Sequence, residues 1–247
     1  MIDRFVFTAM TGAKSAMGQL ATTSHNMANL QTPGFREMLS SFRAVPVTGA
    51  SSDSRAFVVD STPGADWTPG AVSATGNPLD AAIQDEGLFT VQRADGQEAY
   101  TSAGKFQLNA QGFLVNTAGY KVLDDQDRMI QFPVGSKDIQ IQANGAIWAT
   151  LDGQLTETAV ARLKLVNPKL HDLERQPNGL FTSSEQLEPS DDVQVIQGSL
   201  EGSNVNAAQA MVQMIAQNRL FDLNIRLVQA AEQNSKSAGT LMSLSRV

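Results

Sequence analysis

The chain has 247 residues, a formal net charge of −7 at pH 7 and no cysteine, and 42% of its residues are hydrophobic. The hydrophobic content is enough for a packed core, whereas the acidic balance argues against a broad nucleic-acid surface or binding to an anionic membrane, which need clustered Lys and Arg. Without cysteine, disulfides, thiol nucleophiles and Cys-bound metals are excluded.

The chain contains no run of about 18 apolar residues, so we expect no membrane span. Its start is not typical of a cleaved secretory signal, because Asp3 stands where a basic residue is expected and polar residues soon follow Phe5-Val6-Phe7. Export, if it occurs, is expected to use a route without that signal.

The first predicted element is a helix from Ile2 to about Leu30. Small and apolar residues recur there at alternating steps of four and three, which is a heptad-like spacing. The series is Phe5, Ala9, Gly12, Ala16, Gln19, Thr23, Met27 and Leu30, with Met17 and Leu20 widening the stripe.

This helix is expected to end abruptly at Asn29 to Gly34. Pro33 disfavours helical geometry at Thr32, and Gly34 can adopt a positive φ. Phe35 is then expected to anchor the turn in apolar surroundings. As a hypothesis, the side chains of Asn26 and Asn29 cap carbonyl groups near the helix end or bond to a neighbouring helix.

Residues 35–86 are predicted to form an extended linker, because the repeated Thr-Pro-Gly of "STPGADWTPGA" (61–71) leaves little regular pairing. Residues 87–188 alternate apolar and polar residues between tight-turn pairs, which indicates antiparallel β structure. The pairs Asp95-Gly96, Asn144-Gly145, Asp152-Gly153 and Asn178-Gly179 suggest type I′ hairpin turns. Residues 189–206 are a polar return linker.

The last element, residues 207–247, is predicted to be a second long helix, reaching about Leu244. It has the same three–four rhythm, and further apolar residues, among them Val212, Ile215 and Leu223, lie off that series. The predicted seam is Ala207, Met211, Met214, Asn218, Phe221, Ile225, Val228, Glu232, Ser235, Gly239 and Met242. A helix that is apolar on several sides needs several neighbours, and we expect these to be other chains. A helical hairpin folded within one subunit is the alternative.

The predicted fold class is therefore α+β, in which the two long terminal helices pair as a coiled coil and the centre is an antiparallel β domain. The pattern does not decide between a sandwich and a barrel. The expected domains are a helical segment 1–34, a linker 35–86, a β domain 87–188, a return linker 189–206 and a helical segment 207–247.

No catalytic constellation stands out. His25 and His171 lack metal-ligand spacing, and Asp124-Asp125 and Asp191-Asp192 fall in polar stretches that we interpret as solvated loops, with no calcium-loop pattern. Nucleotide-binding and nucleophile-elbow motifs do not occur. We expect no enzyme activity, no cofactor and no bound metal.

Two motifs at opposite ends of the chain resemble those of bacterial flagellar rod and hook proteins. The first is "TTSHNMANLQTPGFR", with Asn26, Ala28, Asn29, Thr32, Gly34 and Phe35 at the matching positions. The second is "GSLEGSNVNAAQAMVQMIAQNRLFDLN" (198–224), in which Ser203-Asn204-Val205 opens the last helix. The segments "GNPLDAAIQDEGLFTVQ" and "AYTSAGKFQLNAQGFLV" are similar too, so the resemblance covers nearly the whole chain.

The resemblance implies a structural subunit that polymerises through its terminal helices into the drive shaft of the flagellum, within the periplasmic space. Its partners would be other rod subunits and, during transit, the flagellar type III export apparatus, without nucleic acid or a membrane span. "FRAVPV" (42–47), "STPGADWTPG" and "GSLEGSNV" favour a proximal-rod member, with a distal-rod member as runner-up. The implied assembly residues are Phe5, Ala9, Ala16, Leu20, Asn26, Met27, Asn29, Leu30, Pro33, Gly34, Phe35, Asn204, Val205, Met211, Met214, Ile215, Arg219, Phe221, Ile225, Val228 and Met242.

Two other classes remain open on the residues alone. One is a β-scaffold enzyme with a helical oligomerisation hairpin, which would show a carboxylate pair in a concave pocket. The other is a secreted adhesin or tail-fibre-like protein, which would form a stable trimer instead of a helical polymer.

Overall fold

The computed structural model describes residues 2–46, 56–84, 86–152, 156–168 and 173–244. The chain divides into two compact units. The helical unit comprises Met1–Ala28, Met38–Ala65 and Asn206–Val247, and the β unit comprises Asn29–Glu37 and Asp66–Val205. Each unit is therefore assembled from segments that are far apart in the sequence.

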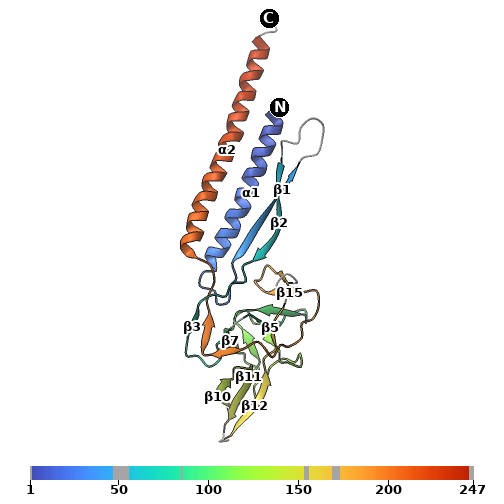
Figure 1. Ribbon diagram of the computed structural model, residues 1–247, viewed down its shortest axis with the longest axis vertical. Helices are drawn as coiled ribbons and strands as arrows, with labels where there is room; N and C mark the ends of the chain where they lie inside the picture. Colours follow the sequence, from blue (N-terminus) through green and yellow to red (C-terminus); the bar gives the residue numbers. More distant parts are fainter. Residues whose placement is uncertain (1, 47–55, 85, 153–155, 169–172, 245–247) are drawn as a thin grey trace. The chain divides into compact units, whose positions relative to one another are not determined.

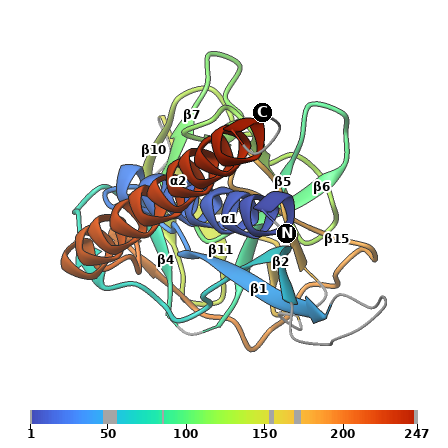
Figure 2. The ribbon, with the colours of Figure 1, turned by 90° about the horizontal axis from the view of Figure 1, so that it is seen from above.

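The helical unit contains helices α1 (Ile2–Ala28) and α2 (Ala207–Leu244) and the antiparallel pair β1 (Met38–Pro46) and β2 (Ala56–Ala65). Helix α1 lies between α2 and the β1–β2 hairpin (Figures 1 and 2). Asn206 caps α2, because its side-chain Oδ1 accepts a hydrogen bond from the backbone N–H of Gln209 (3.1 Å).

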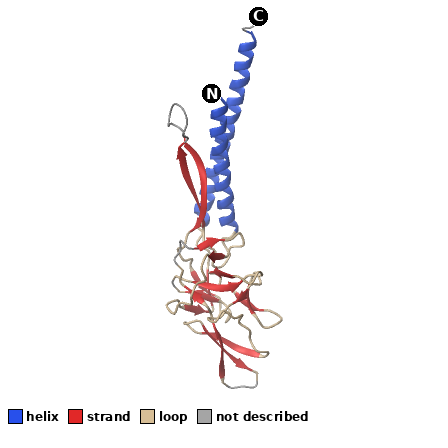
Figure 3. Cartoon of the chain, turned by 90° about the vertical axis from the view of Figure 1, so that its right-hand side faces the viewer, coloured by secondary structure: helices blue, strands red, loops and turns tan. Residues whose placement is uncertain are grey.

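The predicted fold class is wrong. The structure is β-rich, with α1 and α2 as the only described helices (Figure 3), and it does not show coiled-coil pairing. The two helices do lie side by side, but Met211 and Asn218 of the predicted α2 seam are exposed. Among the described side chains of α2, only Ala210 and Ala231 are buried, and both lie off that seam.

Small residues explain this outcome. On α1 the buried apolar side chains are Ala9, Ala13 and Ala16, and at Gly12 the side chain of Asn224 comes so close that an added Cβ would lie 2.8 Å from its Oδ1. Close approach through small residues does not require the interlocking large side chains of a coiled-coil seam. Heptad-like spacing in the sequence therefore identified the helices but not their mode of packing.

The β unit is built on one large antiparallel sheet with the strand order β14-β15-β6-β5-β9-β8-β7, in which β13 also pairs with β5. A three-stranded sheet β10-β11-β12 and the pairs β16-β4 and β17-β3 complete the unit. The strands are β3 (Val72–Ala74), β4 (Ala81–Ile83), β5 (Leu88–Gln92), β6 (Glu98–Thr101), β7 (Phe106–Leu108), β8 (Leu114–Asn116), β9 (Lys121–Val122), β10 (Ser136–Ile141), β11 (Ala146–Leu151), β12 (Glu157–Arg162), β13 (Leu165–Val166), β14 (Leu173–Arg175), β15 (Phe181–Ser183), β16 (Val195–Gln197) and β17 (Ser199–Glu201). Thus β3 and β4 lie within residues 35–86, which the sequence suggested to be an extended linker.

The core of the β unit joins side chains from the large sheet to others from the three-stranded sheet. Phe89 and Phe106 meet edge to face, with ring centroids 5.2 Å apart, and Ile141 and Ile147 belong to the same cluster. This geometry is the favourable one for two aromatic rings. Because apolar side chains of the strands pack into this core, the sequence of these segments alternates between apolar and polar residues.

The predicted hairpin turns occur, but they are not of type I′. Gly96, Gly145 and Gly179 have φ values of 83°, 81° and 82°, while the Asp or Asn before each of them does not have a positive φ. Each of these glycines donates its N–H to the carbonyl three residues earlier, so the glycine closes the turn. A type I′ turn needs two positive φ values, whereas a turn that ends in a left-handed glycine needs one. Gly153 of the fourth pair lies outside the described residues.

Candidate assembly surfaces and the chain junction

Both helices carry large apolar side chains that are exposed in the structure. On α1 these are Phe7, Met10 and Met17. On α2 they are Met211, Val212, Ile215, Leu220, Leu223 and Leu227. Exposed apolar residues in such number on two neighbouring helices are typical of surfaces that bind other proteins.

The end of α1 is held by Asn26, whose side chain is buried. Its Nδ2 donates to the carbonyl oxygen of Met38, and its Oδ1 accepts the N–H of the same residue, both at 2.9 Å. The hypothesis that Asn26 caps helix carbonyls or bonds to another helix is therefore not borne out, since its partner is the backbone at the start of β1. Asn29 closes the following turn, where its carbonyl accepts the N–H of Thr32 and its Oδ1 accepts the Thr32 hydroxyl.

The turn at Gly34 requires glycine for two reasons. Its φ is +68°, and an added Cβ would overlap the backbone of Ser102 and Ala103. Its N–H donates to the carbonyl of Glu201 (2.8 Å), and its own carbonyl accepts the hydroxyl of Ser102 (2.6 Å). The positive φ expected from the sequence is confirmed.

Phe35 is buried beside this turn, as expected. The guanidinium of Arg175 lies 4.6 Å from the centre of its ring, and the same group donates to the carbonyl of Arg36 (2.6 Å). The same guanidinium lies 5.7 Å from the centre of the Phe181 ring, and the ring centroids of Phe181 and Trp67 are 4.6 Å apart. Cation–π and aromatic contacts thus fix the chain as it enters the β unit.

Arg36 and Glu201 form a buried ion pair, with side-chain exposures of 5% and 2%. Arg36 Nη1 lies 2.6 Å from Glu201 Oε1 and also donates to the carbonyl of Thr68, while Glu201 Oε1 accepts the N–H of Gly70. Burial raises the pKa of Glu201 above its ordinary value, although Arg36 acts in the opposite direction. Sequence reasoning missed this pair because its members are 165 residues apart and each looks like an ordinary charged residue.

Asn204, shortly before α2, bonds to two segments from the first part of the chain. Its Oδ1 accepts the N–H of Glu37 (2.6 Å), and its Nδ2 donates to the carbonyls of Asp66 and Thr68. We call the set Gly34, Phe35, Arg36, Glu201 and Asn204 the junction cluster. All five lie in the β unit.

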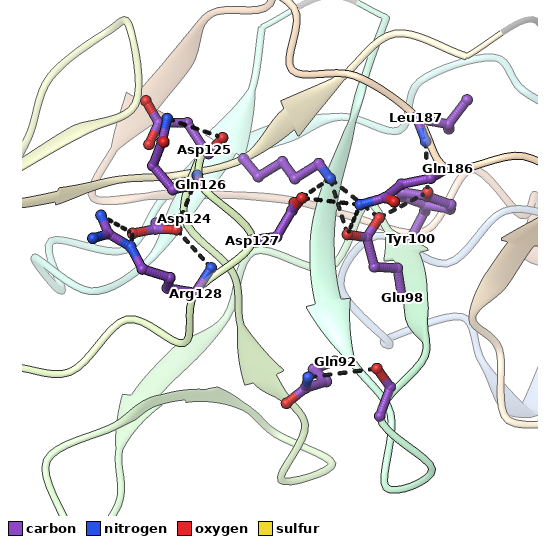
Figure 4. A network of polar contacts seen from close by, with 12 residues as sticks. Gln92, Glu98, Tyr100, Asp124, Asp125, Gln126, Asp127, Arg128, Gln186 and Leu187 are labelled. Atoms are coloured by element: carbon purple, nitrogen blue, oxygen red, sulfur yellow. Dashed lines mark hydrogen bonds and ion pairs between the residues drawn. The ribbon is translucent and has the colours of Figure 1, made fainter.

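A second polar cluster surrounds Lys164, which is almost fully buried. Figure 4 shows Glu98, Asp127 and Gln186 of this cluster. The Nζ of Lys164 pairs with Glu98 (2.9 Å) and with Asp127, and Gln186 bonds to both carboxylates. Burial opposes the charge of Lys164, but the hydrogen bonds that its ammonium donates to Asp127 and Glu98 outweigh this effect and raise the pKa of Lys164. Every charged group here has a partner, so the cluster ties chain segments together and offers no free nucleophile or base.

The same region corrects one sequence interpretation. Asp124 does not lie in a solvated loop. It is buried, and its Oδ1 accepts the N–H groups of Gln126 and Arg128 while Oδ2 pairs with the Arg128 side chain. The carboxylate organises the turn that brings Asp127 to Lys164.

The comparisons with known proteins agree on one family. Residues 82–149 match the model described as "Flagellar hook protein FlgE/F/G D1 domain", and residues 196–241 match "Flagellar basal body rod FlgEFG protein C-terminal". The flagellar basal-body rod protein FlgF of Escherichia coli (strain K12) is 39% identical over 254 residues, which cover 99% of this chain and 100% of that protein. The chain belongs to the flagellar basal-body rod protein family.

Other members of the rod protein family match this chain at different levels of sequence identity. FlgF of Salmonella typhimurium (strain LT2) is 40% identical over 99% of this chain and all of its own length. FlgG of Buchnera aphidicola subsp. Schizaphis graminum is 27% identical over 92% of this chain and 95% of its own. The recognition of the family from the two terminal motifs is thus confirmed, including the likeness to FlgF.

As a member of the rod protein family, the chain is a structural subunit of the flagellar basal-body rod and not an enzyme. None of the described helices is long and apolar enough to cross a bilayer. In the part of the chain that the structure describes, no three His, Cys, Asp or Glu side chains gather as a metal site.

The structure places the implied assembly residues in two groups. Around the end of α1 and the junction cluster, Asn26, Phe35 and Val205 are buried, while Asn29, Leu30, Pro33, Gly34 and Asn204 are half-buried. Along the helices Ala9 and Ala16 are buried, Leu20, Met27, Met214, Phe221, Ile225 and Val228 are half-buried, and Met211, Ile215 and Arg219 are exposed. The side chains of Phe5 and Met242, and all of His171, lie outside what the structure describes.

Proposed function

We propose that this chain is the FlgF-type subunit of the proximal rod and that its helices hold it to neighbouring rod subunits. The observation that carries the proposal is the set of large apolar side chains exposed on α1 and α2. At roughly 25 cal/mol for each Å² of apolar surface buried, such faces supply a strong drive for assembly. In this proposal the polymer transmits motor torque across the periplasm.

In the same proposal the two helices of the helical unit make the contacts between subunits, and the β unit forms a separately folded body that extends beyond the expected residues 87–188 to Asn29–Glu37 and Asp66–Val205. The junction cluster supports this division, because it closes the β unit where the chain enters and leaves it. The partners are other rod subunits, including the distal-rod protein. The flagellar type III apparatus exports the chain, and its lack of cysteine is compatible with transit as an unfolded polypeptide.

The test is to place a charge on the exposed face of α2. In the bacterium that encodes the chain, Leu223→Glu should prevent its recovery in purified basal bodies and abolish swimming. Gln229→Glu adds the same charge at an exposed polar position of the same helix and should be tolerated. Recovery of Leu223→Glu at the parent level would overturn the proposal, and hydrogen exchange of the β unit checks that the variant folds.

A distal-rod subunit is the second candidate, favoured by the similarity to FlgG over 92% of the chain. The higher identity to FlgF supports the proximal position. Basal bodies from cells without their FlgG protein decide between them, since a proximal subunit remains in the rod and a distal one is lost.

A further inference from the structure

One exposed face of α1 combines regular spacing with two methionines. Its residues recur at alternating steps of three and four, and all of them are exposed in the structure. In chain order they are Phe7, Met10, Lys14, Met17, Ala21 and Ser24. The buried residues Ala9, Ala13 and Ala16 each come one position before a member of this face, about 100° around the helix, so the exposed face lies beside the packed face.

Met17 and Met10 are the most exposed methionines whose side chains are described, at 62% and 58%. Met211 on α2 follows at 51%, and Met129 in the β unit at 40%, while the other described methionines are half-buried. Because oxidation of a thioether depends on access of the oxidant, we expect the more exposed methionines to be oxidised faster.

We propose that Met10 and Met17 form a peroxide-oxidation site whose conversion to sulfoxide keeps a subunit out of the rod. The inference rests on the proposed function, because the consequence of oxidation follows from the use of this face in assembly. Each sulfoxide replaces a flexible apolar side chain by a polar one, and the two lie seven residues apart on one stripe. Both changes therefore fall on the same interface.

The oxidant is hydrogen peroxide, and the chemistry is a two-electron transfer. The sulfur lone pair attacks one peroxide oxygen, the O–O bond breaks, and an S–O bond forms. The proton of the transferred oxygen passes to the departing hydroxide, which leaves as water. The sulfur is oxidised, the peroxide is reduced, and a sulfoxide reductase can reverse the change.

Met129 provides a control within the same chain. It is exposed but lies in the β unit, away from both helices in sequence, and the Nζ of Lys121 donates a hydrogen bond to its sulfur (3.2 Å). That bond engages a sulfur lone pair that would attack the peroxide. Its oxidation is therefore expected to be slower and to have no effect on contacts between helices.

The first experiment maps oxidation on the purified full chain by peptide mass spectrometry during treatment with hydrogen peroxide. Met17 and Met10 should gain oxygen several-fold faster than Met129, Met27 and Met214. Equal rates at all methionines, or faster oxidation of Met129, would overturn the assignment of the site.

The second experiment tests the consequence in cells grown with sublethal hydrogen peroxide. Recovery of the parent chain in basal bodies should fall several-fold, whereas a Met10→Leu/Met17→Leu variant should keep its recovery, because leucine stays apolar and cannot form a sulfoxide. Met129→Leu should fall as the parent does. If the double variant falls as far as the parent, the inference is wrong.

The recovery of each chain is expressed relative to the recovery of the same chain from cells grown without peroxide, so any direct effect of the leucine substitutions on assembly is removed from the comparison. A parent chain absent from basal bodies without peroxide contradicts the proposed function, not the reactive site, which the peroxide map on the purified chain decides by itself. The two failures are thus distinguishable.

Discussion

The junction cluster is held together by the buried ion pair of Arg36 with Glu201 and by the hydrogen bonds of the Asn204 side-chain amide. Arg36 is held by Glu201 and by the carbonyl of Thr68, and Glu201 in turn accepts the N–H of Gly70. A buried ion pair of this kind gives modest net stability, but the loss of one partner leaves an uncompensated charge. The cluster therefore acts more as a determinant of one specific chain path than as a source of stability.

Glu201→Gln should lower the free energy of unfolding of the β unit by about 3 kcal/mol, since Arg36 would stay buried without its carboxylate. Urea unfolding followed by tryptophan fluorescence measures the change. Lys137→Gln removes one side of the exposed pair with Asp152 and should cost no more than about 1 kcal/mol. A double variant Arg36→Met/Glu201→Leu that was less stable than Glu201→Gln would contradict the argument.

The Lys164 cluster makes the stability of the β unit depend on pH. The hydrogen bond that Asp127 accepts from Lys164 lowers the pKa of Asp127 below the ordinary value of 3.8. A carboxyl with a depressed pKa contributes stability above its unfolded pKa, and that contribution is lost as pH falls through 3.8 toward the folded value. In acid titrations of unfolding free energy, Asp127→Asn should thus show a shallower decline than the parent, and parallel curves would show that Asp127 contributes nothing.

At the scale of elements, the turn after α1 shows what sequence could and could not predict. The end of the helix, the positive φ of Gly34 and the burial of Phe35 follow from local chemistry and are observed. Their partners Ser102, Arg175 and Glu201 come from distant parts of the chain, and no local pattern identifies them. The burial of Lys164 could not be predicted for a related reason. In an alternating strand pattern a lysine is expected on the solvent-exposed face, and the pattern does not show that two carboxylates from other segments will pair with it.

Gly34→Ala should be more damaging than the same change at Gly179. Both glycines have a positive φ, but a Cβ at Gly34 meets the backbone of Ser102 and Ala103, whereas Gly179 has nothing within 4 Å. We expect a loss of about 1 kcal/mol at Gly179, from backbone strain alone, and at least about twice that at Gly34. Thermal unfolding of the two variants measures the difference, and equal losses would mean that the clash is relieved without cost.

The close approach of α1 and α2 can be tested by a double-mutant cycle at Gly12. Alanine normally stabilises a helix by about 0.5–1 kcal/mol relative to glycine, but here its Cβ would lie 2.8 Å from Asn224 Oδ1, and Asn224 also donates to the carbonyl of Leu220. Gly12→Ala should therefore stabilise the Asn224→Ala background more than the parent, by about 0.5 kcal/mol or more. Circular dichroism during thermal unfolding follows the helices, and additive effects would argue against contact at this point.

At the scale of the whole molecule, charge is divided unevenly between the units. The chain has 25 acidic and 18 basic residues, and the acidic excess lies in the β unit, while the helical unit has more Lys and Arg than Asp and Glu. In the proposed assembly, neighbouring copies associate through the apolar faces of their helices, and we expect their acidic β units to come near one another. Repulsion between the β units opposes the assembly that the helices drive.

Added salt should consequently strengthen assembly of the purified chain. The screening length falls from about 30 Å at 0.01 M to about 8 Å at 0.15 M ionic strength, which weakens repulsion between β units and leaves apolar contacts intact. Sedimentation of the chain, alone or with its rod partners, should show a larger assembled fraction at the higher salt concentration. Leu223→Glu separates the two contributions, because it weakens the apolar contact and should remain largely unassembled at either concentration. A fall in assembly with salt would instead mean that attraction between opposite charges, and not apolar contact between helices, holds the subunits together.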